Sequence, residues 1–106
     1  MNPKYVNRAH LHSTHAQLTD LPNVGRAVAE DLRRLGINHP TQLIGVCPYT
    51  LYEQLNQISG ARHDPCMLDT FISITRFMDG EPAQPWWYYT AERKLRDSEK
   101  NALKDA

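Results

Sequence analysis

Cysteine is scarce in this sequence, and long apolar runs are absent from it. Cys47 and Cys66 are the only two cysteines, and each lies beside a proline at the edge of an expected helix. This spacing supports neither a disulfide framework nor a zinc site of the Cys-x-x-Cys type. No apolar stretch approaches the roughly 20 residues that cross a bilayer, and the first residues lack the apolar region of a signal peptide. We therefore expect a cytoplasmic protein without a membrane partner.

An excess of positive charge is missing as well. Lys and Arg total 12, Asp and Glu total 12, and the formal net charge is zero. Because non-specific attraction to phosphates scales with the cations that displace counterions, any nucleic-acid binding is expected to be local and weak. Hydrophobic residues at 41% and charged residues at 23% are nevertheless typical of a globular chain. A length of 106 residues fits one domain.

The spacing of apolar residues predicts an all-α domain. Residues 1–13 are polar and without periodicity, and we interpret them as a mobile N-terminal arm. The domain itself is expected over residues 14–78, with helices at 14–21, 26–35, 41–44, 48–58 and 65–78, of which Thr41 and Asp64 cap the third and fifth. Residues 79–106 supply a proline-rich connector, four aromatic residues and a C-terminal helix capped by Thr90, and this part is expected to pack on the same domain.

The turn after the first expected helix carries the most informative pattern. Pro22 ends that helix, and Asn23 and Gly25 both tolerate the positive φ that a tight turn requires. Ala29 leaves room where two helices cross, and Val24 fills the gap between them. The main-chain N–H groups of the turn and of the next helix start are then expected to point outward, where they favour an anion such as phosphate.

This pattern resembles the helix-hairpin-helix motif, with Asn23 in place of the motif's first glycine. Residues 18–94 as a whole resemble the pathogenicity-locus family of short bacterial proteins, some of which are labelled mitomycin-resistance proteins, and more distantly the C-terminal domain of competence regulators. The segments that carry the resemblance are Leu21–Gly25, Asp31–Ile37, Leu51–Tyr52, Asp64–Asp69, Trp86–Trp87 and Thr90–Lys94. The resemblance implies a helix-hairpin-helix fold with DNA binding and implies no defined activity.

The order of the expected helices suggests a second hairpin across residues 58–62. The expected fold is therefore a five-helix, double helix-hairpin-helix (SAM-like) bundle, in which two hairpins related by a pseudo-twofold grip a duplex across its minor groove. The second hairpin offers Arg62 but lacks the Gly-x-Gly turn. The expected nucleic-acid-binding residues are Asn23, Val24, Gly25, Arg26 and Arg62. They are expected to contact phosphates of duplex DNA without reading the bases.

Two features leave alternatives open. The hairpin suits a structural helix crossing or a protein-binding module as well as it suits phosphate contact. The aromatic run from Trp86 to Tyr89, next to Arg93, has the composition of a surface on which nucleobases stack. We expect it instead to cover an apolar edge of the bundle, because aromatic residues supply much of the buried surface of a small core. If exposed, the same residues indicate a surface for dimerisation or for a protein partner.

Catalysis, a metal ion and a cofactor are not predicted. His10, His12 and His15 have a spacing that suits a metal, but no acidic or thiol group supports them. His63 and Cys66 lack a third, orienting group, and the phosphate-loop, zinc-protease and serine-hydrolase motifs are absent. We expect a non-enzymatic module that binds DNA weakly and has no small-molecule substrate. The alternative is a protein-protein interaction or homodimerisation module that uses the aromatic and C-terminal segment.

Overall fold

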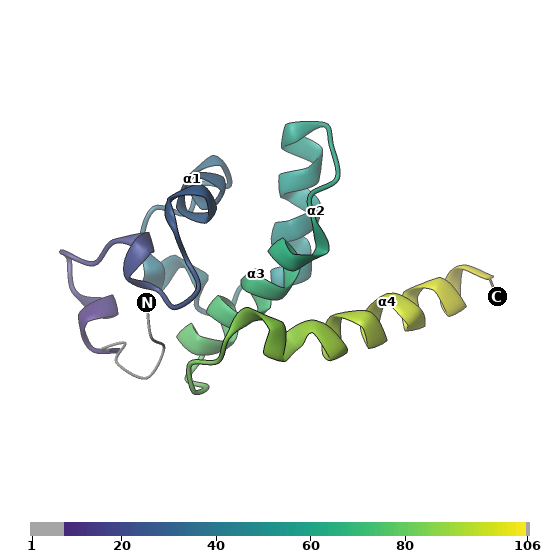
Figure 1. The fold of residues 1–106 in the computed structure, drawn as a ribbon. Coiled ribbons are helices and arrows are strands. Elements are labelled where there is room, and N and C mark those ends of the chain that lie inside the picture. The colour runs from purple at the N-terminus through teal and green to yellow at the C-terminus, as the bar shows by residue number, and fades with distance from the viewer. Residues whose placement is uncertain (1–7, 106) are drawn as a thin grey trace.

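The computed structural model describes residues 8–105, with side chains described through residue 98, and all regular structure in that range is helical (Figure 1). Four α-helices are present: α1 (Arg26–Arg34), α2 (Pro48–Ser59), α3 (Pro65–Met78) and α4 (Thr90–Asp105). The described residues also form four 3-10 helices: η2 (His10–His12), η3 (Leu18–Asp20), η4 (Pro40–Leu43) and η5 (Trp86–Tyr89). The prediction of an all-α chain is confirmed.

The expected helices at 26–35, 48–58 and 65–78 match α1, α2 and α3 to within one residue. The other two expected helices are 3-10 helices and not α-helices. Residues 14–21 contain only η3, and residues 41–44 correspond to η4, which begins at Pro40. A bundle of five full helices is therefore wrong. Thr41 is also not the cap of η4; His39 occupies that position and accepts a hydrogen bond from the Thr41 amide at 3.2 Å.

Helix α3 forms the centre of the molecule. Ten of its 14 residues are buried, which is the pattern of a helix that is covered on nearly every side. Its first turn follows the prediction, since Asp64 caps it through the Cys66 amide at 2.9 Å and Pro65 occupies its first position. Figure 1 shows α3 between α1 on one side and the projecting α4 on the other.

Residues 8–13 belong to the folded part of the structure, which differs from the expected arm. Leu11 in η2 is fully buried in the hydrophobic core. Arg8 donates hydrogen bonds to the carbonyl oxygens of Phe77 and Glu81 and lies 3.9 Å from the centre of the Phe77 ring. A cation at the end of α3 is favourable because the helix dipole is negative there. Residues 1–7, the rest of the expected arm, lie outside the described residues.

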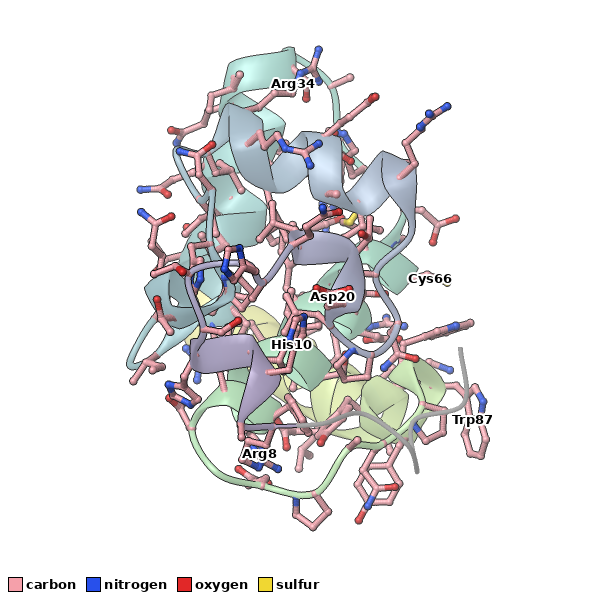
Figure 2. The ribbon with its side chains drawn as sticks, turned by 90° about the vertical axis from the view of Figure 1, so that its left-hand side faces the viewer. Arg8, His10, Asp20, Arg34, Cys66 and Trp87 are labelled. Atoms are coloured by element: carbon pink, nitrogen blue, oxygen red, sulfur yellow. The ribbon has the colours of Figure 1, made fainter. Side chains whose placement is uncertain are left out.

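The same N-terminal segment is tied to η3 by a contact between His10 and Asp20. The Nε2 atom of His10 lies 3.0 Å from a carboxylate oxygen of Asp20, and Figure 2 shows the two side chains together in the middle of this face. Asp20 also accepts a hydrogen bond from the Gln17 amide at 2.8 Å. That amide bond lowers the pKa of the Asp20 carboxyl, so the group is ionised and holds both segments at neutral pH.

A buried carboxylate fastens α4 to α3. Asp69 is fully buried and accepts hydrogen bonds from the Thr90 hydroxyl at 2.7 Å and from Nε of Arg93 at 3.0 Å. Thr90 is thus the first residue inside α4 and contacts another helix, so the prediction that it caps α4 is wrong. Arg76 of α3 adds a paired contact to Glu92 at 2.6 Å. These contacts involve the first turn of α4. In its second turn Arg96 lies 4.4 Å from the centre of the Tyr49 ring of α2, and beyond that the helix extends away from the body (Figure 1).

Candidate functional site

The turn between η3 and α1 has the backbone that the sequence predicts. Asn23 has φ of 67° and is the one residue other than glycine with positive φ among those described. Its carboxamide points inward and donates to the Ser73 hydroxyl at 3.2 Å and to the Gln84 carbonyl at 2.7 Å. The side chain of Asn23 therefore anchors the turn to α3 and to the connector, and it leaves the outer side of the turn clear.

Val24 presents neither its side chain nor its main-chain N–H group to a ligand. Its side chain is buried in the core, and its amide donates to the Leu21 carbonyl at 3.4 Å. The sequence placed the outward-facing N–H groups around Val24. In the structure the amides without an intrahelical partner begin two residues later, at Arg26.

The N-terminus of α1 is open. Gly25 is the N-cap residue, and no side chain caps the helix. The first main-chain hydrogen bond of the helix joins the Ala29 amide to the Gly25 carbonyl at 3.0 Å, so the three preceding N–H groups, those of Arg26, Ala27 and Val28, lack an intrahelical partner. Gly25, Arg26 and Ala27 are exposed. The positive end of the helix dipole is thus accessible from outside.

Gly25 is not required by the fold itself. Its φ of −97° and ψ of −170° are extended values that other residues adopt readily, and a Cβ placed there meets no atom within 4 Å. Neither the backbone nor internal packing therefore explains a glycine at this position. The absence of a side chain keeps the approach to the amides unobstructed.

Charges around this N-terminus are mixed. Arg26 is exposed and makes no hydrogen bond or ion pair within the part of the chain that the structure describes. One turn further on, Glu30 is exposed, and Asp31 lies 3.8 Å from Arg34 in an ion pair. Within the described residues Arg26 is therefore an unpaired cation at the first position of α1, while Glu30 and Asp31 lie farther along the helix.

The N-terminus of α3, which belongs to the second expected hairpin, is closed by the chain's own carboxylate. The loop before it is fixed by a hydrogen bond from the Tyr52 hydroxyl to the His63 carbonyl and by another from the His63 amide to Asn56 at 2.8 Å. Asp64 then caps the helix, and the hydrogen bond from the Cys66 amide lowers the pKa of its carboxyl. An ionised oxygen already occupies the place that a phosphate takes at an open helix start.

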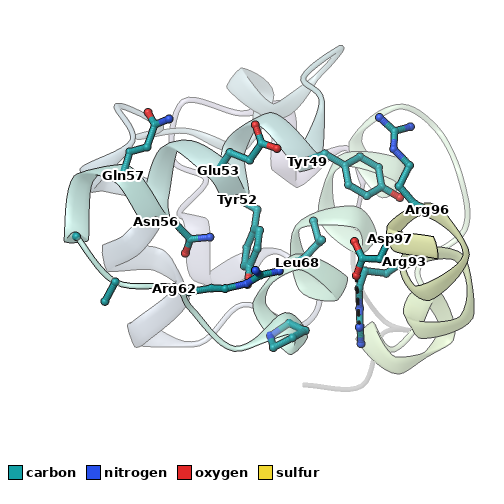
Figure 3. Close-up of a pocket in the computed structure, with 13 residues that line it drawn as sticks. Tyr49, Tyr52, Glu53, Asn56, Gln57, Arg62, Leu68, Arg93, Arg96 and Asp97 are labelled. Carbon is teal, nitrogen blue, oxygen red and sulfur yellow. Dashed lines mark ion pairs between the residues drawn. The ribbon is translucent and has the colours of Figure 1, made fainter. Parts of the chain in front are cut away.

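Arg62 does not lie with the other expected binding residues. It lines a groove of about 920 Å³ between α2 and α4, where Figure 3 shows it extending toward Tyr52 and Leu68. Val28 of α1 lines a separate depression of about 370 Å³. The structure therefore brings Asn23 to Arg26 together in one turn and places Arg62 in a different groove.

Most of the aromatic run is exposed, so the expectation that it covers an apolar edge is correct for Tyr89 alone. Tyr89 is buried, whereas Trp87 and Tyr88 expose 63% and 58% of their surface and Trp86 exposes 37%. These residues form the 3-10 helix η5, whose three residues per turn direct neighbouring side chains to different sides. Trp87 stands out from the body on the side where Cys66 lies (Figure 2).

The described residues offer neither a cluster of metal ligands nor a membrane-spanning helix. Within residues 8–98 no three His, Cys, Asp or Glu side chains gather in a way that suits a metal ion. No described helix combines the length and the apolar character needed to cross a bilayer. His10, the first of the three histidines considered for a metal, is engaged with Asp20.

These features define a small all-helical protein in which α1 starts without a side-chain cap, α3 starts with one, and an aromatic segment is exposed. The model of the pathogenicity locus family matches residues 12–95, and the chain belongs to this family. It is similar to the mitomycin resistance protein McrB of Streptomyces lavendulae, with 48% identity over 82 residues that make up 77% of this chain and 78% of the relative. No solved structure matches the chain.

Proposed function

We propose that this protein is a non-enzymatic nucleic-acid-binding module that holds DNA phosphates on the N-terminus of α1 without reading base sequence. In this proposal η3, the turn and α1 act as a helix-hairpin-helix. The observation that carries it is the uncapped start of α1, where a glycine that the fold does not require leaves the amides accessible. A phosphate oxygen at this position accepts hydrogen bonds from N–H groups that have no other partner and is stabilised by the helix dipole.

Arg26 supplies the neighbouring positive charge in this proposal. Its guanidinium is exposed and has no ion pair in the described part of the chain, so it pays no cost of breaking an internal contact when it approaches a phosphate. One cation on a protein of zero net charge displaces few counterions. We therefore expect the weak end of non-specific binding, with a Kd on the order of 10⁻⁴ to 10⁻⁵ M at physiological salt.

The proposed contact is local, so a site-resolved titration tests it. Adding a short DNA duplex to isotope-labelled protein is expected to shift the amide resonances of Gly25 to Val28 more than any others. Arg26→Glu is expected to weaken binding at least fivefold. Arg33→Glu is the matched control, because it makes the same charge change on the same helix about 10 Å farther along its axis. At about 0.1 M salt the Debye length is also about 10 Å, which screens the control site from the proposed phosphate.

Two results contradict the proposal. One is the absence of any resonance change at Gly25 to Val28 at millimolar duplex. The other is an equal loss of affinity in Arg26→Glu and Arg33→Glu, which indicates a diffuse charge effect with no particular place for the phosphate.

A second candidate function is self-association or binding of a protein partner through the C-terminal part. The exposed surfaces of Trp87, Tyr88 and Leu95, each above one half, favour this alternative. Light scattering at increasing protein concentration tests it. A dimer that Trp87→Ser and Leu95→Glu abolish supports dimerisation, and a monomer at millimolar concentration contradicts it. Both substitutions are at exposed positions, so we expect the fold to remain intact.

A further inference from the structure

The depression beside the start of α1 is a slot with one aromatic wall. Its volume is about 370 Å³, near the lower end of the roughly 300 to 1,000 Å³ that ligand sites occupy. The slot is shallow and open to solvent. It is lined by Val28 of α1, Met67 and Thr70 of α3 and Trp86 of η5, together with three residues around the start of α3, here called its rim: His63, Asp64 and Cys66. A depression of this volume has room for one planar ring system.

The indole ring of Trp86 lines this slot, and no other aromatic ring or cation in the described chain stacks on it. About a third of its surface, 37%, is exposed, and it makes no ring contact with another described aromatic or cation. Val28 and Met67 are partly buried against the core and supply apolar surface to the same lining. An open indole face with apolar neighbours is the arrangement on which nucleobases stack in proteins that bind unpaired strands.

The slot and the proposed phosphate site share a helical turn. Val28, a wall of the slot, is two residues after Arg26, a distance of about 3 Å along the helix axis. Its amide is one of the three N–H groups without an intrahelical partner. Val28 is therefore common to the proposed phosphate site and to the slot.

The rim of the slot also orients such a nucleotide. Asp64 is ionised and repels a phosphate, and its carboxylate closes the start of α3. The phosphate is thus excluded from the α3 side and accepted on the α1 side. The base edge, which carries N–H donors, is the part of a nucleotide that tolerates a carboxylate nearby.

We infer that the slot receives one unpaired nucleobase, stacked on Trp86, from the same nucleotide whose phosphate lies at the start of α1. This inference rests on the proposed function and narrows its ligand. Bases inside an intact duplex are stacked and paired and do not reach a side slot. The ligand is therefore a nucleic acid that contains an unpaired nucleotide, and intact duplex binds through phosphate contact alone.

Two oligonucleotides that differ in a single base test the inference. Both are the same duplex with one extra, unpaired nucleotide; in one that nucleotide carries adenine, and in the other it is abasic. The two have equal numbers of phosphates, so a difference in affinity reports the base. Wild-type protein is expected to bind the adenine-bearing duplex about 5- to 150-fold more tightly, the effect of one stacked base.

Variants of the aromatic segment assign that difference to the slot. Trp86→Ala is expected to remove the preference and to leave binding of the abasic and intact duplexes unchanged. Trp86→Leu serves the same purpose if the alanine variant unfolds, because leucine fills the wall with apolar atoms and lacks a ring face. Trp87→Ala is the matched control, since Trp87 is a neighbouring exposed tryptophan outside the slot and its loss is expected to preserve the preference.

Equal affinity for the adenine-bearing and abasic duplexes overturns the inference, and so does a preference that persists in a folded Trp86 variant. If both duplexes bind equally and Arg26→Glu weakens both, the proposed function stands and only the base slot is refuted. If neither duplex nor the intact control binds, the proposed function and the inference are both refuted.

Discussion

Replacing Gly25 by Asp is expected to stabilise the protein and at the same time to abolish phosphate binding. The backbone at Gly25 is extended, as N-cap residues are, and a Cβ there meets no atom within 4 Å, so the new side chain enters without strain. Its carboxylate is then able to accept hydrogen bonds from the open amides of α1. Asp64 shows the same arrangement at the start of α3, with an N···O distance of 2.9 Å.

The size of the gain follows from two contributions. An N-cap Asp is better than Gly by a few tenths of a kcal/mol, and a carboxylate at the positive end of a helix dipole adds about 0.3 to 1 kcal/mol. The sum is about 0.5 to 1.3 kcal/mol, which corresponds to a rise in Tm of roughly 2 to 8 °C for a domain of this size. A phosphate has to displace this carboxylate against like-charge repulsion, so we expect an affinity loss of more than about tenfold.

Thermal melts followed by circular dichroism measure the stability, and the duplex titration described above measures binding. Gly25→Ala is the control for shape, because it adds a Cβ without an acceptor, and Gly25→Asn is the control for charge, because it adds a neutral cap. If Gly25→Asp is less stable than the wild type, the α1 amides are not free. If it is more stable and binds DNA as well as the wild type, the phosphate lies elsewhere and the reasoning is refuted.

Three further predictions concern the fold. Leu11→Ala is expected to lower the free energy of unfolding by about 2 to 5 kcal/mol in urea titrations, because it empties a fully buried site in the N-terminal segment; a change below about 1 kcal/mol contradicts the packing described. Arg93→Met is expected to cost about 3 kcal/mol or more, because it leaves Asp69 buried with only the Thr90 hydroxyl as a partner; urea titration checks this, and an unchanged midpoint contradicts it. The pKa of Asp64 is lowered in the folded state, so its ionised carboxylate stabilises the fold above the usual pKa of 3.8, and this contribution is lost as pH falls through the lower folded-state pKa. The Tm measured by thermal melts from pH 2 to 6 is therefore expected to depend less on pH in Asp64→Asn than in the wild type. Identical dependence of Tm on pH in the two proteins contradicts the assignment.

Regular helices were predictable where periodicity and caps agree. In α3, apolar residues recur along 14 positions, Asp64 provides the cap and Pro65 fits the first turn, so local and tertiary preferences coincide. Residues 14–21 carry only two leucines at helical spacing, and Pro22 prevents the helix from continuing. The three-residue 3-10 helix η3 is short enough to end before Pro22 and still buries Leu18. Leu11 is a single apolar residue among polar ones, and no period indicates that it is buried.

The candidate site was predictable at the level of the backbone. Asn23 adopts the predicted left-handed conformation, and Gly25 begins an uncapped helix. The directions of side chains were not predictable, since the inward carboxamide of Asn23 depends on where α3 and the connector lie. The place of Trp86 beside α1 depends likewise on the path of residues 79–85, which carry no periodic pattern.

The two hydrogen bonds of the Asn23 carboxamide have a consequence for spacing along the surface. One side chain fixes the turn that precedes α1 and, through Gln84, the segment that leads to Trp86. The Asn23 carboxamide therefore links the turn ahead of the open amides directly to the segment ahead of the indole, in addition to the packing of both on α3. A glycine at this position permits the same φ but removes that link.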